Sequence, residues 1–167
     1  MTSVRITSWS SGPGELASDA SFSPDGKMVA YGSAASGSTQ IYVVPTAGGR
    51  TIPVTDNYYN QHPVWSPDGQ DIAFFSQRGD ESGLWRVSFT GGEQRQILSK
   101  LGPVTQPLVW ATSGKIYFRE AYEVFSVDPE TGAREQVSDF AGKGIRPWVI
   151  EISDDGSLIA FSQTDGD

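Results

Sequence analysis

A short motif recurs along the chain at a nearly constant interval, and this repeat limits the possible folds more than any other feature. Its clearest copies read Phe-Ser-Pro-Asp-Gly and Trp-Ser-Pro-Asp-Gly, with Ile-Ser-Asp-Asp-Gly and Trp-Ala-Thr-Ser-Gly as divergent copies. The four copies end at Gly26, Gly69, Gly156 and Gly114. Their leading apolar residues are 43, 45 and 42 residues apart in chain order: Phe22, Trp65, Trp110 and Ile152. An interval of roughly 40–45 residues is typical of the four-stranded blades of β-propellers.

Each copy predicts a tight turn between two short strands. Proline presets the φ angle of the turn, aspartate bonds nearby backbone groups, and glycine completes the reversal. Apolar second strands are predicted at residues 28–31, 72–75, 116–118 and 158–161, and third strands at 41–44, 84–87 and 124–127. Short fourth strands are predicted around 52–54, 96–98 and 135–137. The third copy has Thr112-Ser113-Gly114 in place of Pro-Asp-Gly, which predicts a shortened turn.

These repeats resemble the TolB-type propeller repeat, a WD-like bacterial repeat that carries the Trp-Ser-Pro-Asp-Gly turn. The resemblance covers essentially residues 16–163. The predicted fold is all-β: a β-propeller of four-stranded antiparallel blades, with three full blades plus partial terminal strands. The predicted units are the outer strand of a preceding blade at 1–15, blades at 16–56, 57–98 and 99–140, and a half blade at 141–167.

The number of blades bears on whether the ring is complete. TolB-like propellers resemble six-bladed rings, which need roughly 258 residues at this blade length, whereas the chain has 167. We therefore expect an incomplete ring or a segment of a larger propeller, with a self-contained or oligomer-completed ring of four blades as the alternative. An open arc would also offer its unpaired blade edges for self-association.

Composition argues against several classes of function. A net charge of −8 opposes binding to nucleic acid and to anionic membranes, and no apolar run approaches the roughly 18 residues that membrane insertion requires. The chain has no cysteine, a single histidine, His62, and no Gly-x-Ser-x-Gly motif. Asp154 and Asp155 lack the spacing of a calcium loop. We predict no catalytic residue, no metal site and no cofactor.

The candidate ligand-binding residues lie in the links that lead into the first strand of each blade. Residues 56–62 form the link that is richest in aromatic and polar groups, which suits recognition of a protein, peptide or glycan. The predicted set is Asp19, Tyr58, Tyr59, Asn60, Gln61, His62, Gln106, Arg146 and Trp148. The alternative is that Tyr58 and Tyr59 only pack over the blade beneath them. Arg78-Gly79-Asp80 matches an adhesion tripeptide, but matches of three residues are common by chance.

The resemblance implies a non-catalytic interaction or scaffold module that binds its ligand through a loop face. The alternative that it also implies is the substrate-gating propeller of a prolyl-oligopeptidase-type serine peptidase. An α/β-hydrolase sequence downstream of Asp167 would distinguish the two. The resemblance further implies a periplasmic or extracytoplasmic location, although residues Met1 to Trp9 lack the features of a secretory signal.

Overall fold

The fold is all-β. The computed structural model describes residues 17–34, 36–102 and 105–163, and these form three four-stranded antiparallel sheets and one two-stranded sheet. The described ranges contain no helix, and so none that could cross a membrane. The prediction of a propeller built from four-stranded antiparallel blades is confirmed, whereas the outer strand predicted at 1–15 lies outside the described residues.

Within each sheet, every strand pairs with its neighbour in the chain. The first sheet contains β1 (Ala17–Phe22), β2 (Met28–Ser33), β3 (Gln40–Pro45) and β4 (Ile52–Pro53). The second contains β5 (Tyr59–Trp65), β6 (Asp71–Arg78), β7 (Glu81–Ser88) and β8 (Arg95–Ser99). The third contains β9 (Thr105–Trp110), β10 (Ile116–Glu120), β11 (Glu123–Val127) and β12 (Arg134–Gln136), and the fourth contains β13 (Ile150–Ile152) and β14 (Ile159–Phe161). The exact limits of the blades, at residues 56, 98 and 140, stay predictions.

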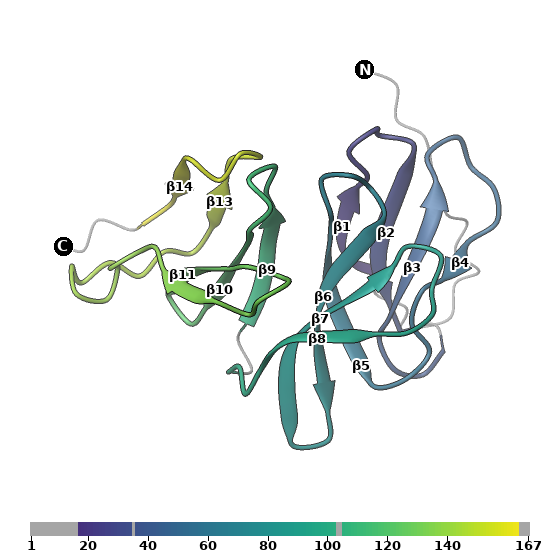
Figure 1. The fold of residues 1–167 in the computed structure, drawn as a ribbon, viewed down its shortest axis with the longest axis horizontal. Coiled ribbons are helices and arrows are strands. Elements are labelled where there is room, and N and C mark those ends of the chain that lie inside the picture. The colour runs from purple at the N-terminus through teal and green to yellow at the C-terminus, as the bar shows by residue number, and fades with distance from the viewer. Residues whose placement is uncertain (1–16, 35, 103–104, 164–167) are drawn as a thin grey trace.

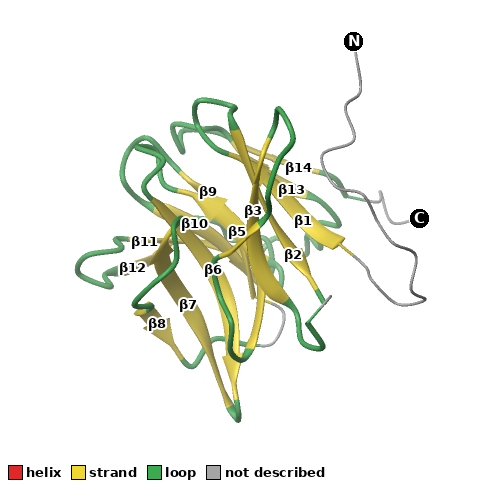
Figure 2. Ribbon diagram, turned by 90° about the vertical axis from the view of Figure 1, so that its right-hand side faces the viewer, coloured by secondary structure: helices red, strands yellow, loops and turns green. Residues whose placement is uncertain are grey.

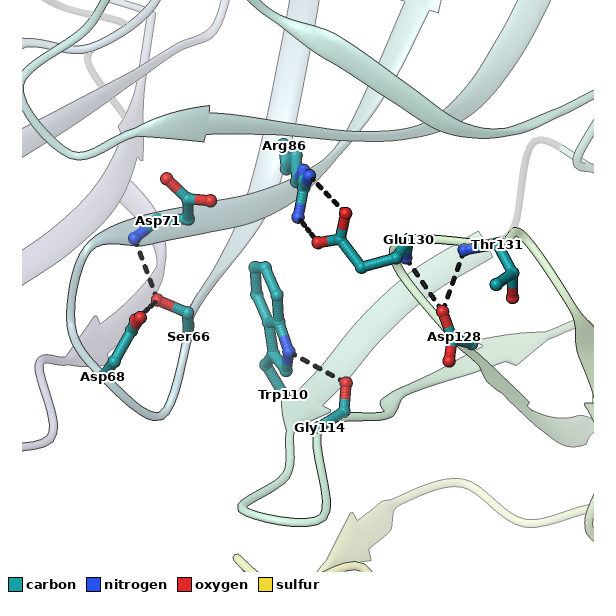
Figure 3. Close-up of polar contacts among 9 residues, drawn as sticks. All are labelled: Ser66, Asp68, Asp71, Arg86, Trp110, Gly114, Asp128, Glu130 and Thr131. Carbon is teal, nitrogen blue, oxygen red and sulfur yellow. Dashed lines mark hydrogen bonds and ion pairs between the residues drawn. The ribbon is translucent and has the colours of Figure 1, made fainter.

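The repeated motif forms the turn between the first and second strands of each sheet. In the second sheet, the Ser66 hydroxyl donates to Asp68 Oδ1 at 2.6 Å and accepts the Asp71 backbone N–H at 2.8 Å (Figure 3). The same two bonds recur in the first and fourth sheets. A serine and an aspartate two residues apart therefore stabilise three of the four turns.

The turn of the third copy is one residue shorter than the others. The Ala111 N–H donates to the carbonyl of Lys115, four residues later, whereas the Ser66 N–H donates to the carbonyl of Asp71, five residues later. The indole of Trp110 also donates to the Gly114 carbonyl at 3.2 Å (Figure 3). The loss of the Pro-Asp pair thus leaves a tighter hairpin in an otherwise equivalent sheet.

Apolar residues fill the boundaries between successive sheets. Three buried clusters separate the four sheets, and each contains the leading residue of the following repeat. Trp65 packs toward the first sheet, where its indole N–H donates to the Ser21 carbonyl at 3.0 Å. Trp110 lies in the cluster between the second and third sheets, and Ile152 in the cluster between the third and fourth. The core is therefore a series of apolar layers between sheets.

A polar contact joins the second and third sheets beside these layers. Arg86 on β7 forms an ion pair with Glu130, which lies in the turn between β11 and β12 (Figure 3). Asp128 Oδ1 accepts the backbone N–H groups of Glu130 and Thr131, each at 2.9 Å, and this holds the turn that carries the glutamate.

The first strands of the sheets are neighbours across the sheet boundaries, where β1 contacts β5, β5 contacts β9, and β9 contacts β13. The described sheets follow one another in an arc that does not close into a ring (Figure 1).

We call the end of the sheets that carries the repeated motif the turn face. The opposite end, with the links between sheets and the turns between second and third strands, is the loop face. A hollow of about 560 Å³ opens at the turn face and is lined by residues of all four sheets.

Candidate functional site

Seven of the nine predicted binding residues lie on first strands or at the link that enters β5, and the other two lie on the link before β13. Because consecutive strands run in opposite directions, these links share the loop face with the turns between second and third strands. The side chains nevertheless divide into separate groups, which are described in turn.

A buried amide network holds the link that enters β5. Gln40 on β3 donates to the Tyr58 carbonyl at 2.8 Å and accepts hydrogen bonds from Asn60 Nδ2 at 2.9 Å and from the Thr55 hydroxyl at 2.8 Å. Asn60 is completely buried. Among the predicted residues, Asn60 thus fixes the path of the backbone and does not reach the surface.

The network presents Tyr58 at the surface in a constrained conformation. Tyr58 has a φ of 68°, in the left-handed region, and 52% of its surface is exposed. The guanidinium carbon of Arg78, at the end of β6, lies 4.5 Å from the centre of the Tyr58 ring and 3.2 Å from that of Trp85 on β7. Arg78 Nε also donates to the Ser76 hydroxyl at 3.1 Å. We call Tyr58, Arg78 and Trp85 the stacked platform.

Tyr59 and Gln61 lie next to the platform on β5. Their side chains are two residues apart and therefore share one side of the strand, and the Tyr59 hydroxyl donates to Gln61 Oε1 at 3.0 Å. The hairpin of β6 and β7 has eight residues in each strand, against six in β2 and β3 and five in β10 and β11. It projects beyond its neighbours, at the bottom of Figures 1 and 2. The platform thus lies on the most prominent hairpin, with Arg78 next to the turn that closes it.

Asp19 and His62 meet between the first strands of the first two sheets. Both lie in a bulge of the strand pairing and have positive φ angles, 53° and 55°. The His62 Nδ1 and Asp19 Oδ2 atoms approach to 2.7 Å, at ion-pair distance but without the alignment of a hydrogen bond. Burial lowers the pKa of His62; Asp19 opposes this effect and Arg119 adds to it. Burial thus favours the neutral form of the imidazole.

The third sheet contributes Gln106 and Arg119 to the same region. They are directly opposed partners on β9 and β10. Arg119 Nε is buried and makes no hydrogen bond with the described residues. Asp19, His62 and Arg119 thus form an inner polar group that draws one side chain from each of three sheets.

Arg146 and Trp148 both lie on the link before β13. The Arg146 guanidinium carbon lies 5.7 Å from the centre of the Tyr122 ring, and Trp148 is 73% exposed. No contact found in the described part of the chain joins either residue to Tyr58 or His62. The contacts that the structure describes thus do not link Arg146 or Trp148 to the other two groups.

Sequence analysis missed three residues of these groups: Arg78, Trp85 and Arg119. Arg78 stood in a tripeptide set aside as a chance match, and the other two lie on second and third strands, away from the links. A signal for Trp85 was available, because aromatic residues recur at this position in the third strand of the other two four-stranded sheets, as Tyr42 and Phe125.

The described residues contain no cluster of three His, Asp or Glu side chains that could hold a metal ion. His62 makes no hydrogen bond with a serine in the ranges that the structure covers. These groups consist of aromatic rings, amides and a guanidinium that two rings hold in place.

Comparison with known proteins gives a consistent family. The model of the "TolB beta propeller domain" family matches residues 2–123. The Tol-Pal system protein TolB 1 of Novosphingobium aromaticivorans is 36% identical over 42% of this chain and 16% of its own length. Dipeptidyl-peptidase 5 of Porphyromonas gingivalis is 30% identical over 79% of this chain and 23% of its own length. The crystal structure of TolB from Acinetobacter baumannii superposes with a TM-score of 0.76 at 18% identity, over 92% of this chain and 39% of that one. The chain thus spans less than a quarter of either of these two curated relatives.

Proposed function

Because this chain belongs to the TolB β-propeller family, we propose that it is a non-catalytic interaction module that binds a polypeptide through its loop face. The stacked platform is the observation that carries the proposal. Tyrosine, tryptophan and arginine are the residues most enriched at the energetic centres of protein interfaces, and here all three are held in one arrangement beside a projecting hairpin. An extracytoplasmic location belongs to the same proposal and rests on the resemblance to the family.

The rigidity of the platform supports a role in recognition. Tyr58 is fixed by the bond from Gln40 to its carbonyl, and Arg78 is fixed by Trp85 and Ser76. A surface that is ordered before binding loses little conformational entropy when a partner docks. The platform can therefore contribute more of its contact energy to affinity than a mobile loop of the same composition.

The test is a random peptide library displayed on phage and selected on this chain. We expect the enriched peptides to bind at least about tenfold more weakly to the double variant Tyr58→Ala/Tyr59→Ala, because exposed interface tyrosines often contribute more than 1 kcal/mol each. Tyr122→Ala removes another exposed tyrosine of the loop face, outside the platform, and serves as the matched control. Equal affinity for the wild type and the double variant, both with unchanged urea unfolding, would contradict the proposal.

The similarity to a dipeptidyl-peptidase favours a second candidate. In that case the chain is the propeller of a serine peptidase, and the loop face or the hollow between the sheets would meet the substrate before a separate catalytic domain. The gene that encodes this chain decides between the two functions. A Gly-x-Ser-x-Gly motif in an α/β-hydrolase sequence after codon 167 favours the peptidase, and its product would react with a fluorophosphonate probe.

A further inference from the structure

Each complete sheet carries a pair of aromatic residues at the same position of its second and third strands. In every case the two residues are directly opposed in the strand pairing: Tyr31 and Tyr42, Phe74 and Trp85, and Phe118 and Phe125. In two of the sheets an arginine lies over the third-strand ring. The guanidinium carbon of Arg78 is 3.2 Å from the centre of Trp85, and that of Arg134 is 3.7 Å from the centre of Phe125.

The two stacked arginines differ in their polar partners. Arg134 forms an ion pair with Glu120, and Glu120 is itself held by the Gly102 N–H at 2.8 Å. The second sheet has Ser76 where the third has Glu120, since each lies two residues after the aromatic residue of the second strand. Arg78 therefore donates only to neutral oxygens, those of Ser76 and of the Gln94 side chain.

No carboxylate of the described residues lies at ion-pair distance from Arg78. Glu81 lies directly opposite Arg78 in the strand pairing, but its side chain is exposed and forms no ion pair with Arg78. Burial lowers the pKa of Arg78, and the group that opposes this effect is Tyr58. Because an arginine in a protein keeps its proton, the platform holds a cation that forms no ion pair with any described residue.

The guanidinium also retains donors. Arginine has five N–H groups; the bonds to Ser76 and Gln94 involve Nε and Nη2, and Nη1 makes no hydrogen bond within the described part of the chain. The two rings fix the guanidinium plane, and Tyr58 borders it with a half-exposed side chain. A carboxylate that takes the free donors forms charge-assisted hydrogen bonds with a group that is already oriented.

We propose that Arg78 binds a carboxylate of the polypeptide that docks on the loop face, with Tyr58 in contact with the same ligand. The inference deepens the proposed function and rests on it. The third sheet supplies the reason for choosing a carboxylate: Arg134, which reaches the equivalent third-strand ring from the fourth strand and not from the second, has Glu120 as its partner. The ligand group is either an aspartate or glutamate side chain or the carboxylate of a chain terminus.

The first test needs no identified partner. N-acetylglutamate is titrated into the labelled chain at about 0.15 M salt, where distant charges are screened over about 8 Å, while the Nε–H signals of Arg78 and Arg134 are followed by NMR. We expect a saturable shift of the Arg78 signal, no shift of the Arg134 signal, and no shift of either with N-acetylglutamine amide, a probe of similar size that has no carboxylate. An unchanged Arg78 signal, or equal shifts with the two probes, would overturn the proposal.

The second test uses the peptides that the library selection enriches. Replacing the acidic residue of a peptide by its amide should weaken binding to the wild type about tenfold or more, which is the usual effect of a hydrogen bond to a charged group, and should have little effect on binding to Arg78→Gln. Arg134→Gln is the matched control and should behave as the wild type. If amidation of the peptide C-terminus has the effect instead, the ligand group is a terminal carboxylate.

The two proposals fail separately. Peptides that depend on Tyr58 and Tyr59 but bind the wild type and Arg78→Gln equally would remove the carboxylate site and leave the interaction module. An Arg78 signal that responds to N-acetylglutamate while no peptide is enriched would leave a carboxylate site without support for polypeptide binding.

Discussion

Phe22 and Trp65 occupy the same position in successive repeats, yet their surroundings differ. Trp65 packs against the first sheet and is 5% exposed, whereas Phe22 is 66% exposed. Trp110 and Ile152, at the same position in the later repeats, are also buried. The leading residue of each repeat packs backward onto the preceding sheet, and Phe22 has no described sheet behind it. Equivalent residues in a repeat protein therefore have unequal energetic roles, because each is stabilised across a boundary with its neighbour.

The largest loss of stability is expected when the buried leading residue Trp65 is replaced, in contrast to the exposed leading residue Phe22. Trp65→Ala should lower the free energy of unfolding by roughly 3–5 kcal/mol, since it removes a buried ring and leaves a cavity between two sheets. Phe22→Ala changes an exposed side chain, and its free energy of unfolding should lie within about 0.5 kcal/mol of the wild-type value. Urea unfolding of the two variants measures both values. Similar losses in the two variants would show that Phe22 is packed in solution as Trp65 is.

A smaller contrast is expected between two glycines of the repeated turn. Gly26 and Gly156 both have positive φ angles, so alanine costs roughly 1–2 kcal/mol at either position. A Cβ at Gly26 would meet nothing within 4 Å, but at Gly156 it would lie 2.5 Å from the ring of Tyr117 on the neighbouring sheet. Overpacking adds roughly 1–3 kcal/mol, and Gly156→Ala should therefore be the more destabilising change in thermal unfolding.

The ring of Tyr117 is the proposed source of that additional loss. In the background of Tyr117→Leu, which removes the clashing ring atoms, Gly156→Ala should cost about as much as Gly26→Ala does in the wild type. An undiminished cost in this background would show that the backbone of the fourth turn, and not the sheet boundary, is responsible.

The smallest effect is expected from the carboxylates of the turns. The Lys27 backbone N–H and the Ser23 hydroxyl lower the pKa of Asp25 from 3.8 to about 2, and the hydroxyl of Ser153 is the main cause of a similar value for Asp155. A carboxyl group whose pKa is lower in the folded chain than in the unfolded chain stabilises the fold at any pH above its unfolded pKa. This contribution is lost as the pH falls from about 3.8 toward 2.

The measurement is urea unfolding at several pH values between 4.5 and 2. Stability should fall less steeply with acid in Asp25→Asn/Asp155→Asn than in the wild type. Parallel curves for the wild type and the double variant would show that these turns do not respond to pH. The third turn has Ser113 at the aspartate position, and it therefore adds no carboxylate to the pH dependence of the wild type or of the variant.

Much of the fold could be read from local sequence signals. The turn motif and the apolar runs that follow it place β2, β6, β10 and β14 to within a few residues, because proline, aspartate and glycine act on the backbone next to them. The replacement of Pro-Asp by Thr112-Ser113 correctly predicted a shorter third turn. These features depend on residues that are close together in the chain.

The candidate site was accessible only in part. The composition of residues 56–62 directed attention to the link that carries Tyr58 of the stacked platform, but it did not separate buried Asn60 from exposed Tyr58. That difference depends on Gln40, which is twenty residues away from Asn60 on another sheet. The partners of Tyr58 were missed for the same reason, because Arg78 and Trp85 reach it through the pairing of β6 and β7 and not through sequence proximity.

The sequence by itself determined the repeat, the strand order, the turn chemistry and the residues that lead each blade, since all of these follow from short-range backbone preferences and a regular period. Only the tertiary structure decided which leading residues are buried, which of two stacked arginines has a carboxylate partner, and which tyrosine is presented at the surface. Burial and charge pairing depend on the neighbouring sheet, and identical repeat positions acquire different neighbours when the sheets pack together.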